Sequence, residues 1–165
     1  MDSKTLLPND LVEVISQTVL AVMNHAGADV TLKQAEFLAK QAQKRANQIG
    51  VPMSIAVVDS STNLVLHQRM EKALLVSVNA ALNKAYTAAS FGMSSGKLLD
   101  ITQSEMVLTA LQNGDGRIMP LSGGLPIVVN EQIIGAIGVS GGQANQDEEV
   151  ALYALQAFSQ TPCEG

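Results

Sequence analysis

The spacing of apolar residues predicts two helices in the first third of the chain. One apolar stripe repeats every three to four residues and consists of Leu11, Ile15, Val19 and Val22. A second stripe occupies residues 32–49, behind Thr31 and Gln34, which have the spacing of a capping box. Gly50 follows and is a typical helix end. We therefore expect helices over about 11–26 and 32–49.

Two apolar runs in the middle of the chain predict a β-hairpin. Residues 53–58 are apolar on both faces, which favours a central strand, whereas residues 64–70 alternate with a period of two. The polar stretch 59–63 between them has the composition of a turn. The alternation places Leu64, Leu66 and Met70 on one face of the strand. The opposite face carries Val65, His67 and Arg69.

An alanine-rich stretch, 73–91, predicts a long helix in which Lys84 is the only charged residue. A short helix is expected over 94–103. The following stretch has no clear pattern before the turn-like residues 113–116, and Arg117–Met119 is a candidate short strand.

Two Ser-Gly-Gly loops flank the second β region. The apolar runs 127–129 and 133–139 are separated by three polar residues, as in a hairpin. The outer end of each run carries one loop, and the loop residues are Ser122, Gly123, Gly124, Ser140, Gly141 and Gly142. A hairpin brings both loops to the same end of the sheet. A final helix is expected from about Asn145, with Glu148 at capping-box spacing, to Phe158.

These elements favour an α+β fold in which helices pack on the faces of an antiparallel sheet of about five strands. We expect three segments. Residues 1–30 form an appended N-terminal helix, 31–160 a single domain and 161–165 a tail.

The composition limits the class of protein. Of the 165 residues, 47% are hydrophobic, which is enough for a core, and the net charge of −5 argues against nucleic acid as a partner. No apolar run is long enough to span a membrane, and the N-terminus lacks the pattern of a signal peptide. The single cysteine, Cys163, cannot form an internal disulfide. We expect a soluble, cytoplasmic protein.

The chemistry that the residues suggest centres on the glycine loops. Glycine lets backbone N–H groups approach another group closely, so the loops could hold an anionic ligand, pack against a neighbouring subunit or simply form turns. Arg69 and Lys84 are the candidate cations for such a ligand. Asp147 and Glu148 are candidate proton-handling residues, or else helix-capping residues. Zinc-ligand spacing, a Walker loop, a dinucleotide fingerprint and a nucleophile elbow are all absent from the sequence.

An ordered set of short motifs resembles the GlcG/HbpS family, which includes the C-terminal domain of PduO-like corrinoid adenosyltransferases. The resemblance covers about residues 31–158. The motifs are, in order, Val57-Val58-Asp59, Arg69-Met70, Ser77, Ala81, Lys84-Ala85, Thr87-Ala88-Ala89, Gly123–Ile127, Ile134–Gly142 and Gln146-Asp147-Glu148.

The resemblance implies a profilin-like fold, a symmetric homo-oligomer (tetramer or octamer) and haem as the leading ligand. Haem iron takes an axial ligand, most often histidine, and the two histidines, His67 and His25, are the candidates. The chain departs from the family pattern at Glu71-Lys72-Ala73, where Asp-Gly-Ala is common, and at Ser61-Thr62, where Gly-Gly is common. No metal other than haem iron is implied.

Three functions stay open at this point. The first is a small-molecule-binding protein of the GlcG/HbpS type with haem or another tetrapyrrole as ligand. The second is an enzyme or accessory protein that acts on a small anionic metabolite in a catabolic pathway. The third is an oligomeric assembly protein without catalysis.

Overall fold

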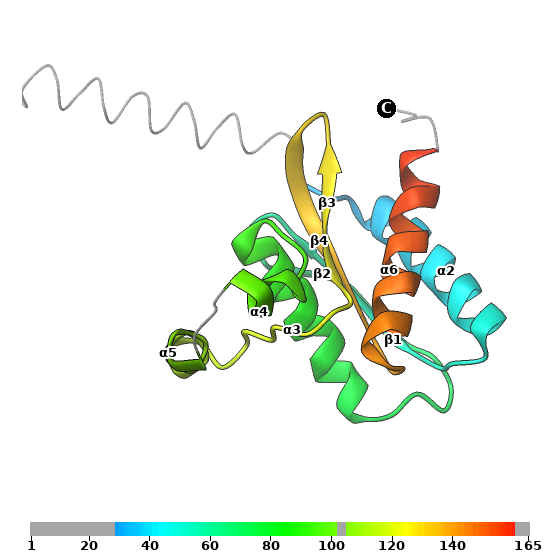
Figure 1. Cartoon of the computed structure of the whole chain (residues 1–165). Coiled ribbons are helices and arrows are strands. Elements are labelled where there is room, and N and C mark those ends of the chain that lie inside the picture. The colour runs from blue at the N-terminus through cyan, green and yellow to red at the C-terminus, as the bar shows by residue number, and fades with distance from the viewer. Residues whose placement is uncertain (1–28, 102–104, 161–165) are drawn as a thin grey trace, which may run out of the picture.

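The computed structural model describes residues 29–101 and 105–160 of the chain. They form one antiparallel sheet between two layers of helices (Figure 1). The helix expected over 11–26, the end of the helix expected over 94–103 and the tail after residue 160 lie outside the described residues. The predicted division into three segments therefore stays a prediction.

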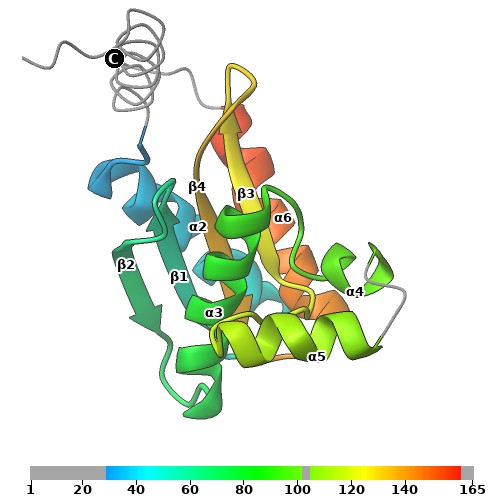
Figure 2. The ribbon, with the colours of Figure 1, turned by 90° about the vertical axis from the view of Figure 1, so that its left-hand side faces the viewer.

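Within the described residues the sheet has four strands. These are β1 (Ser54–Asp59), β2 (Leu64–Arg69), β3 (Gly124–Val129) and β4 (Gln132–Ser140). Their spatial order is β2-β1-β4-β3, and each neighbouring pair is antiparallel (Figure 2). Both predicted hairpins are confirmed, and β1 takes the central place that its apolar faces predicted.

Helices cover both faces of this sheet. On one face lie α2 (Leu32–Ile49) and α6 (Ala144–Ser159), which pack against each other as well as on the strands (Figure 1). On the other face lies α3 (Val76–Phe91), with α4 (Lys97–Ile101) and α5 (Glu105–Gly114) on the same side (Figure 1).

The expectation of about five strands is wrong for the described residues, because the segment Arg117–Met119 does not join the sheet. The Ile118 N–H donates to the carbonyl oxygen of Asp115 at 3.1 Å, which closes a turn. The Met119 N–H donates to the hydroxyl of Thr87 on α3 at 2.8 Å. These bonds satisfy the backbone donors of Ile118 and Met119 outside the sheet, so an apolar pair of residues was not enough to make a strand.

The helix ends show where local sequence rules held. Thr31 and Gln34 form the predicted capping box of α2, and Gly50 ends this helix with a φ of +70°. For α6 the predicted capping pair lies two residues too far along the chain. Gln143 caps the helix and exchanges hydrogen bonds with Gln146, so Asn145 and Glu148 are not the capping pair.

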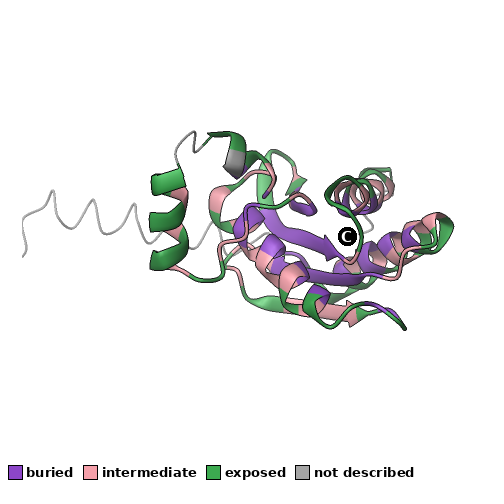
Figure 3. Cartoon of the chain, turned by 60° about the horizontal axis from the view of Figure 1, so that its bottom comes forward, coloured by how far each residue is buried: buried purple, intermediate pink, exposed green. Residues whose placement is uncertain are grey.

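The two faces of the sheet are packed with side chains of different size. The face beneath α2 and α6 is filled by large aliphatic residues, among them Leu38, Ile55, Val57, Ile137 and Val150. The face beneath α3 is made of alanines, namely Ala56, Ala81, Ala85, Ala88 and Ala136, together with Val58. A Cβ built on Gly138 would lie 2.0 Å from the Ala81 carbonyl oxygen, so α3 rests almost directly on the sheet. The buried residues concentrate along this sheet (Figure 3).

Strand β2 keeps the predicted alternation only in its second half. His67 pairs with Ala56 and Arg69 with Ser54, so both lie on the α3 face as predicted. The register shifts between Val57 and Val58, and Val65 packs against the core beneath α2. The prediction that Val65 shares a face with His67 and Arg69 is therefore wrong, because the irregularity interrupts the period of two.

Helix α5 fills the stretch that had no clear pattern. It contains no buried residue, and Met106 and Val107 are exposed on it. Its apolar side chains therefore add little to the core of the described chain.

Two general features of the described residues bear on function. None of their helices has the length and apolar composition needed to cross a membrane. Their His, Cys, Asp and Glu side chains form no group of three or more that could hold a metal ion.

Candidate functional site

Lys84 occupies a buried position between the two glycine loops. It is 3% exposed, and so is Asp147 in the first turn of α6. Lys84 Nζ donates to Asp147 Oδ2 at 2.6 Å and to the carbonyl oxygen of Val139 at 3.1 Å. The charge of the lysine is therefore neutralised inside the protein, by a residue that the sequence suggested for proton handling.

The two glycine loops lie at the same end of the sheet, where Gly124 of β3 pairs with Gly138 of β4. Their backbone donors point at carboxylates of the same chain. The Gly123 N–H donates to Glu148 Oε2 at 2.7 Å, and the Gly142 N–H donates to Asp147 Oδ1 at 2.9 Å. The loops thus bind anions, but these anions are the first acidic residues of α6.

Steric demand accounts for the glycines themselves. Gly123 has a φ of +116°, and a Cβ there would lie 2.5 Å from the Val139 carbonyl oxygen. A Cβ on Gly124 would lie 2.2 Å from the Lys84 carbonyl oxygen. Both distances are below contact for carbon and oxygen, so only glycine lets α3 and α6 approach these loops.

Electrostatics within this cluster act in opposite directions on Asp147. Burial raises the pKa of its carboxyl above the usual value, while Lys84 and the Gly142 N–H oppose this change. Because the pKa is raised in the folded state, protonation of Asp147 stabilises the fold. This stabilisation is complete below the ordinary pKa and is lost as pH rises through the raised value. The Lys84 partnership is what allows a carboxylate at this depth.

Glu148 and two serines join the first glycine loop to the segment before α4. Ser94 Oγ donates to Glu148 Oε1 at 3.1 Å, and the Gly124 N–H donates to Ser95 Oγ at 3.0 Å. Sequence reasoning missed both serines. Their partners are 54 and 29 residues away, so no local pattern could have found them.

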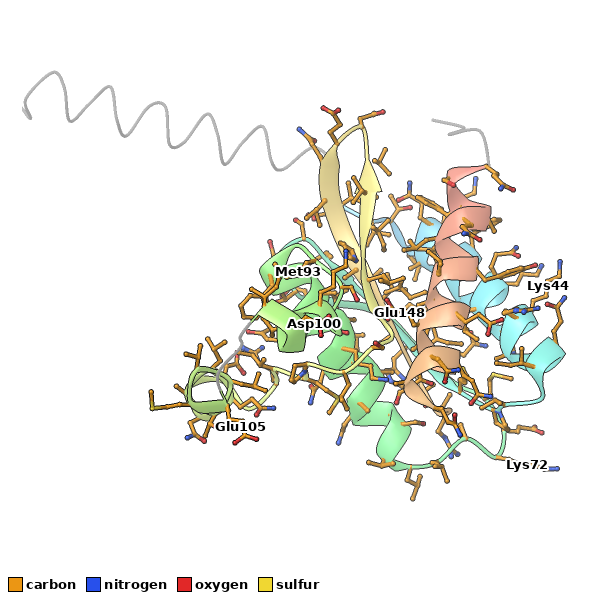
Figure 4. The ribbon with its side chains drawn as sticks, viewed as in Figure 1. Lys44, Lys72, Met93, Asp100, Glu105 and Glu148 are labelled. Carbon is orange, nitrogen blue, oxygen red and sulfur yellow. The ribbon has the colours of Figure 1, made fainter. Side chains whose placement is uncertain are left out.

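A cavity of about 420 Å³ opens beside this junction. Its polar lining includes Ser94, Lys97, Asp100, Ser122 and Glu148. Asp100 comes from α4 and Glu148 from α6, the two helices that flank the cavity (Figure 4). Of the predicted ligand-binding residues, the structure thus brings Ser122 to a cavity that also holds a cation and two carboxylates.

A second cavity, of about 540 Å³, lies between the end of α2 and the loop after β2. Its charged lining is Arg69, Glu71 and Lys72, and Gln43 and Asn47 contribute amides. The structure therefore separates Arg69 from Lys84, two cations that the sequence suggested for one ligand. Ser140 is buried, and a Cβ on Gly141 would lie 2.5 Å from the Pro52 carbonyl oxygen, so this second loop packs against the start of β1.

His67 is half-buried on β2, with its ring directed at α3. Nε2 lies 3.0 Å from the carbonyl oxygen of Val78. Arg69, on the same face, donates from Nη1 to the Ala73 carbonyl oxygen at 2.9 Å. His67 therefore links β2 to α3, and Arg69 links it to the segment before α3. The other histidine, His25, lies outside the described residues.

An exposed charged cluster sits where α5 returns to α3. The Arg117 guanidinium stacks on the ring of Tyr86, 4.0 Å from its centroid, and bonds both oxygens of Asp115. Tyr86 also donates its hydroxyl to Asp115. The Arg117 and Tyr86 donors lower the pKa of the Asp115 carboxyl well below its usual range. The sequence predicted only a turn at 113–116 and a candidate strand from Arg117, and it gave no sign of this cluster.

Comparison with known proteins assigns this arrangement to a family. Residues 30–156 match the family described as haem degrading protein HbpS-like, so the chain belongs to that family, as the ordered motifs indicated. The chain is 40% identical over 134 residues to a 15.0 kDa protein from the dhaT–dhaS intergenic region of Citrobacter freundii, covering 81% of this chain and 94% of that protein.

Solved structures agree. The Klebsiella pneumoniae protein ORFY is 39% identical with a TM-score of 0.76, and the match covers 80% of this chain and 92% of ORFY. The PduOC structure solved as a haem complex is 31% identical with a TM-score of 0.73, over 78% of this chain and 94% of PduOC.

Proposed function

We propose that this protein binds haem or a closely related tetrapyrrole. The observation that supports it most is the likeness to PduOC in its haem complex, at 31% identity over 78% of this chain. Membership of the HbpS-like family supports the same class of ligand.

The described residues fit the iron of haem only in part. The sequence has two histidines, and Nε2 of His67 already lies at 3.0 Å from the Val78 carbonyl oxygen. A ligand bond from that nitrogen would break the link between β2 and α3. His67 also lines neither cavity described above. The proposal therefore assigns the axial position to His25, and His67, whose second ring nitrogen Nδ1 takes no part in that bond, stays the alternative.

Haem also carries carboxylates, which need cations or backbone donors. Lys84 is neutralised by Asp147, and the N–H groups of Gly123 and Gly142 bond Glu148 and Asp147. Of the predicted ligand-binding groups, Arg69 is the cation left with an exposed side chain. A carboxylate would therefore bind near Arg69 rather than at the glycine loops.

Titration of the full chain with hemin, followed by its Soret absorbance, tests the proposal. We expect a saturable Soret band in the wild type that persists in His67→Ala. In His25→Ala the band should shift and the Kd should rise at least tenfold. Thermal melts of both variants would show that they fold.

Two outcomes would contradict this proposal. A wild-type titration without saturation would remove haem as the ligand. A band that is lost in His67→Ala and kept in His25→Ala would retain haem and overturn the assignment of the axial histidine.

The 420 Å³ cavity favours a second candidate, a role in handling a small polar metabolite. Lys97 could meet an acidic group there, while Ser122, Asp100 and Glu148 could accept from hydroxyl or amine groups. Crystals soaked with lactate or serine should show density between α4 and α6. Two results would count against this role: ligand density that persists in Lys97→Gln, and a wild-type crystal without ligand density.

Assembly as a homo-oligomer, a tetramer or octamer, belongs to the same proposal. Leu74, Leu75 and Val76 are consecutive and 62–79% exposed, a surface that a neighbouring subunit would cover. Light scattering coupled to size exclusion should show a smaller species for Leu75→Asp. Leu64→Asp, at another exposed leucine, is the matched control. A monomeric wild type would exclude assembly.

A further inference from the structure

We propose that the cavity of about 540 Å³ between α2 and the loop after β2 is a binding site for a small organic carboxylate. We call it the basic cavity. Its charged and amide lining consists of Gln43, Asn47, Arg69, Glu71 and Lys72. The site rests on the residues of the cavity. Because Arg69 is also the cation proposed above for a haem carboxylate, hemin and a small carboxylate are expected to compete there.

The cations of the basic cavity differ from Lys84 in having no carboxylate partner. Within residues 29–101 and 105–160, neither Arg69 nor Lys72 takes part in an ion pair. Arg69 is exposed, yet its Nη1 is fixed by the Ala73 carbonyl oxygen at 2.9 Å. That bond fixes the guanidinium beside the loop that lines the cavity, and it is the one hydrogen bond of this side chain among the described residues. A planar fork of donors suits a carboxylate.

The backbone holds Lys72 in an unfavourable conformation at the mouth of the cavity. Its φ is +66°, in the left-handed region that favours glycine. A side chain retained at such a position is a pointer to function. Lys72 extends outward from the loop below the last turn of α2 (Figure 4). Lys72 therefore adds a second cationic residue to the lining of the cavity.

The other residues that line the cavity determine which body the carboxylate ligand can carry. Ala46, Val51, Pro52 and Met70 provide apolar contacts, and the amides of Gln43 and Asn47 add hydrogen-bonding groups. A cavity of this volume is within the range of small-molecule sites. The carboxylate of Glu71 on the same rim disfavours ligands with several negative charges. A short monocarboxylate with an apolar body is thus the class that fits.

Binding of butyrate by the full-length protein, measured by calorimetry at constant ionic strength, tests the inference. We expect saturable binding by the wild type that is tighter for butyrate than for acetate, because only butyrate reaches the apolar wall. Affinity should fall at least tenfold in Arg69→Gln. It should also fall in Lys72→Gly, which keeps the fold because glycine accepts a φ of +66° without strain.

Lys44→Gln is the matched control. Lys44 is an exposed lysine on α2 (Figure 4) that does not line the cavity, and the substitution removes the same charge. We expect wild-type affinity for butyrate in this variant. A general attraction of anions to surface lysines would instead weaken binding equally in Lys44→Gln and Lys72→Gly.

Three results would overturn the inference. The first is a wild type that shows no saturable binding of butyrate. The second is affinity that is unchanged in both Arg69→Gln and Lys72→Gly. The third is inorganic phosphate bound as tightly as butyrate, which would show that the apolar wall takes no part. A haem titration that fails while butyrate binds would reject the haem proposal alone.

Discussion

The glycine-loop cluster and the basic cavity contain similar residues and use them in opposite ways. In the cluster, Lys84 is buried and Asp147 meets its charge at 2.6 Å. In the cavity, Arg69 and Lys72 are exposed and have no ion-pair partner among the described residues. The pairing of charges, and not their presence, distinguishes a structural cluster from a candidate binding site.

The difference follows from what each region joins. The cluster connects α3, the β3–β4 hairpin and α6, so any unpaired charge there would be isolated from water. The cavity lies at a sheet end, where solvent compensates the cations at little cost. A ligand can therefore gain from Arg69 without disturbing the fold, whereas a ligand at Lys84 would have to displace Asp147.

The largest expected effect is the loss of one member of the buried pair. Asp147→Ala leaves Lys84 buried without a counter-charge, and we expect a loss of about 3–5 kcal/mol in the free energy of unfolding. Urea denaturation measures it. Arg69→Gln, at the cavity, should lose less than about 1 kcal/mol by the same method. Equal losses in the two variants would remove the contrast between the regions.

The paired substitution Lys84→Met with Asp147→Leu sharpens the same comparison. Replacing both charges by apolar side chains of similar length removes the cost of an unpaired ion, so the double variant should be more stable than Asp147→Ala. The loss in the free energy of unfolding should be smaller for the double variant than the sum of the losses in Lys84→Met and Asp147→Leu. Equal values would show that the two charges are not coupled, and the interpretation of the cluster would be wrong.

Glycine substitutions give the next largest effect. Gly124→Ala brings a Cβ to 2.2 Å from the Lys84 carbonyl oxygen, and we expect a loss of about 1–3 kcal/mol. Gly50→Ala, at the rim of the cavity, meets no atom within 4 Å and pays only for its φ of +70°, at about 1 kcal/mol. In thermal unfolding, the Tm of Gly124→Ala should be lower than the Tm of Gly50→Ala. The reverse order would contradict the close approach of α3.

The smallest effect is expected at the exposed cluster around Asp115. The lowered pKa of Asp115 means that its contribution to stability is present above the ordinary value of about 3.9 and is lost as pH falls through the lowered one. Wild type should therefore exceed Asp115→Asn in stability at pH 7, and this difference should shrink below pH 4. A difference that is constant with pH would exclude this ion pair as its source.

Much of the fold could be read from local patterns. The capping box at Thr31, the helix end at Gly50 and the two hairpins all depend on residues close together in sequence. The fifth strand was expected wrongly, because Met119 donates instead to Thr87 on α3, which is 32 residues away in sequence. The helix α5 was not predicted, and it contains no buried residue.

Individual residues of the candidate sites could be predicted from the sequence, but not which of them lie together in space. Arg69 and Lys84 were identified from the sequence, yet one lines a cavity and the other is a buried partner of Asp147. Lys72 was noticed only as a departure from the family pattern. Its importance depends on a φ of +66° and on the end of α2, neither of which leaves a mark in the local sequence.

The sequence by itself determined the family, both hairpins, the helices that pack on the sheet and the position of both glycine loops, because short-range patterns specify these. Only the tertiary structure decided which charges are neutralised. Asp147 and Lys84 are 63 residues apart, and Glu148 and Gly123 are 25 apart. Pairing at such separations is fixed by how α6 packs onto the sheet. The predicted anion site at the glycine loops is therefore occupied by carboxylates of α6, which stabilise the fold. The cations of the basic cavity have no ion pair within the described chain.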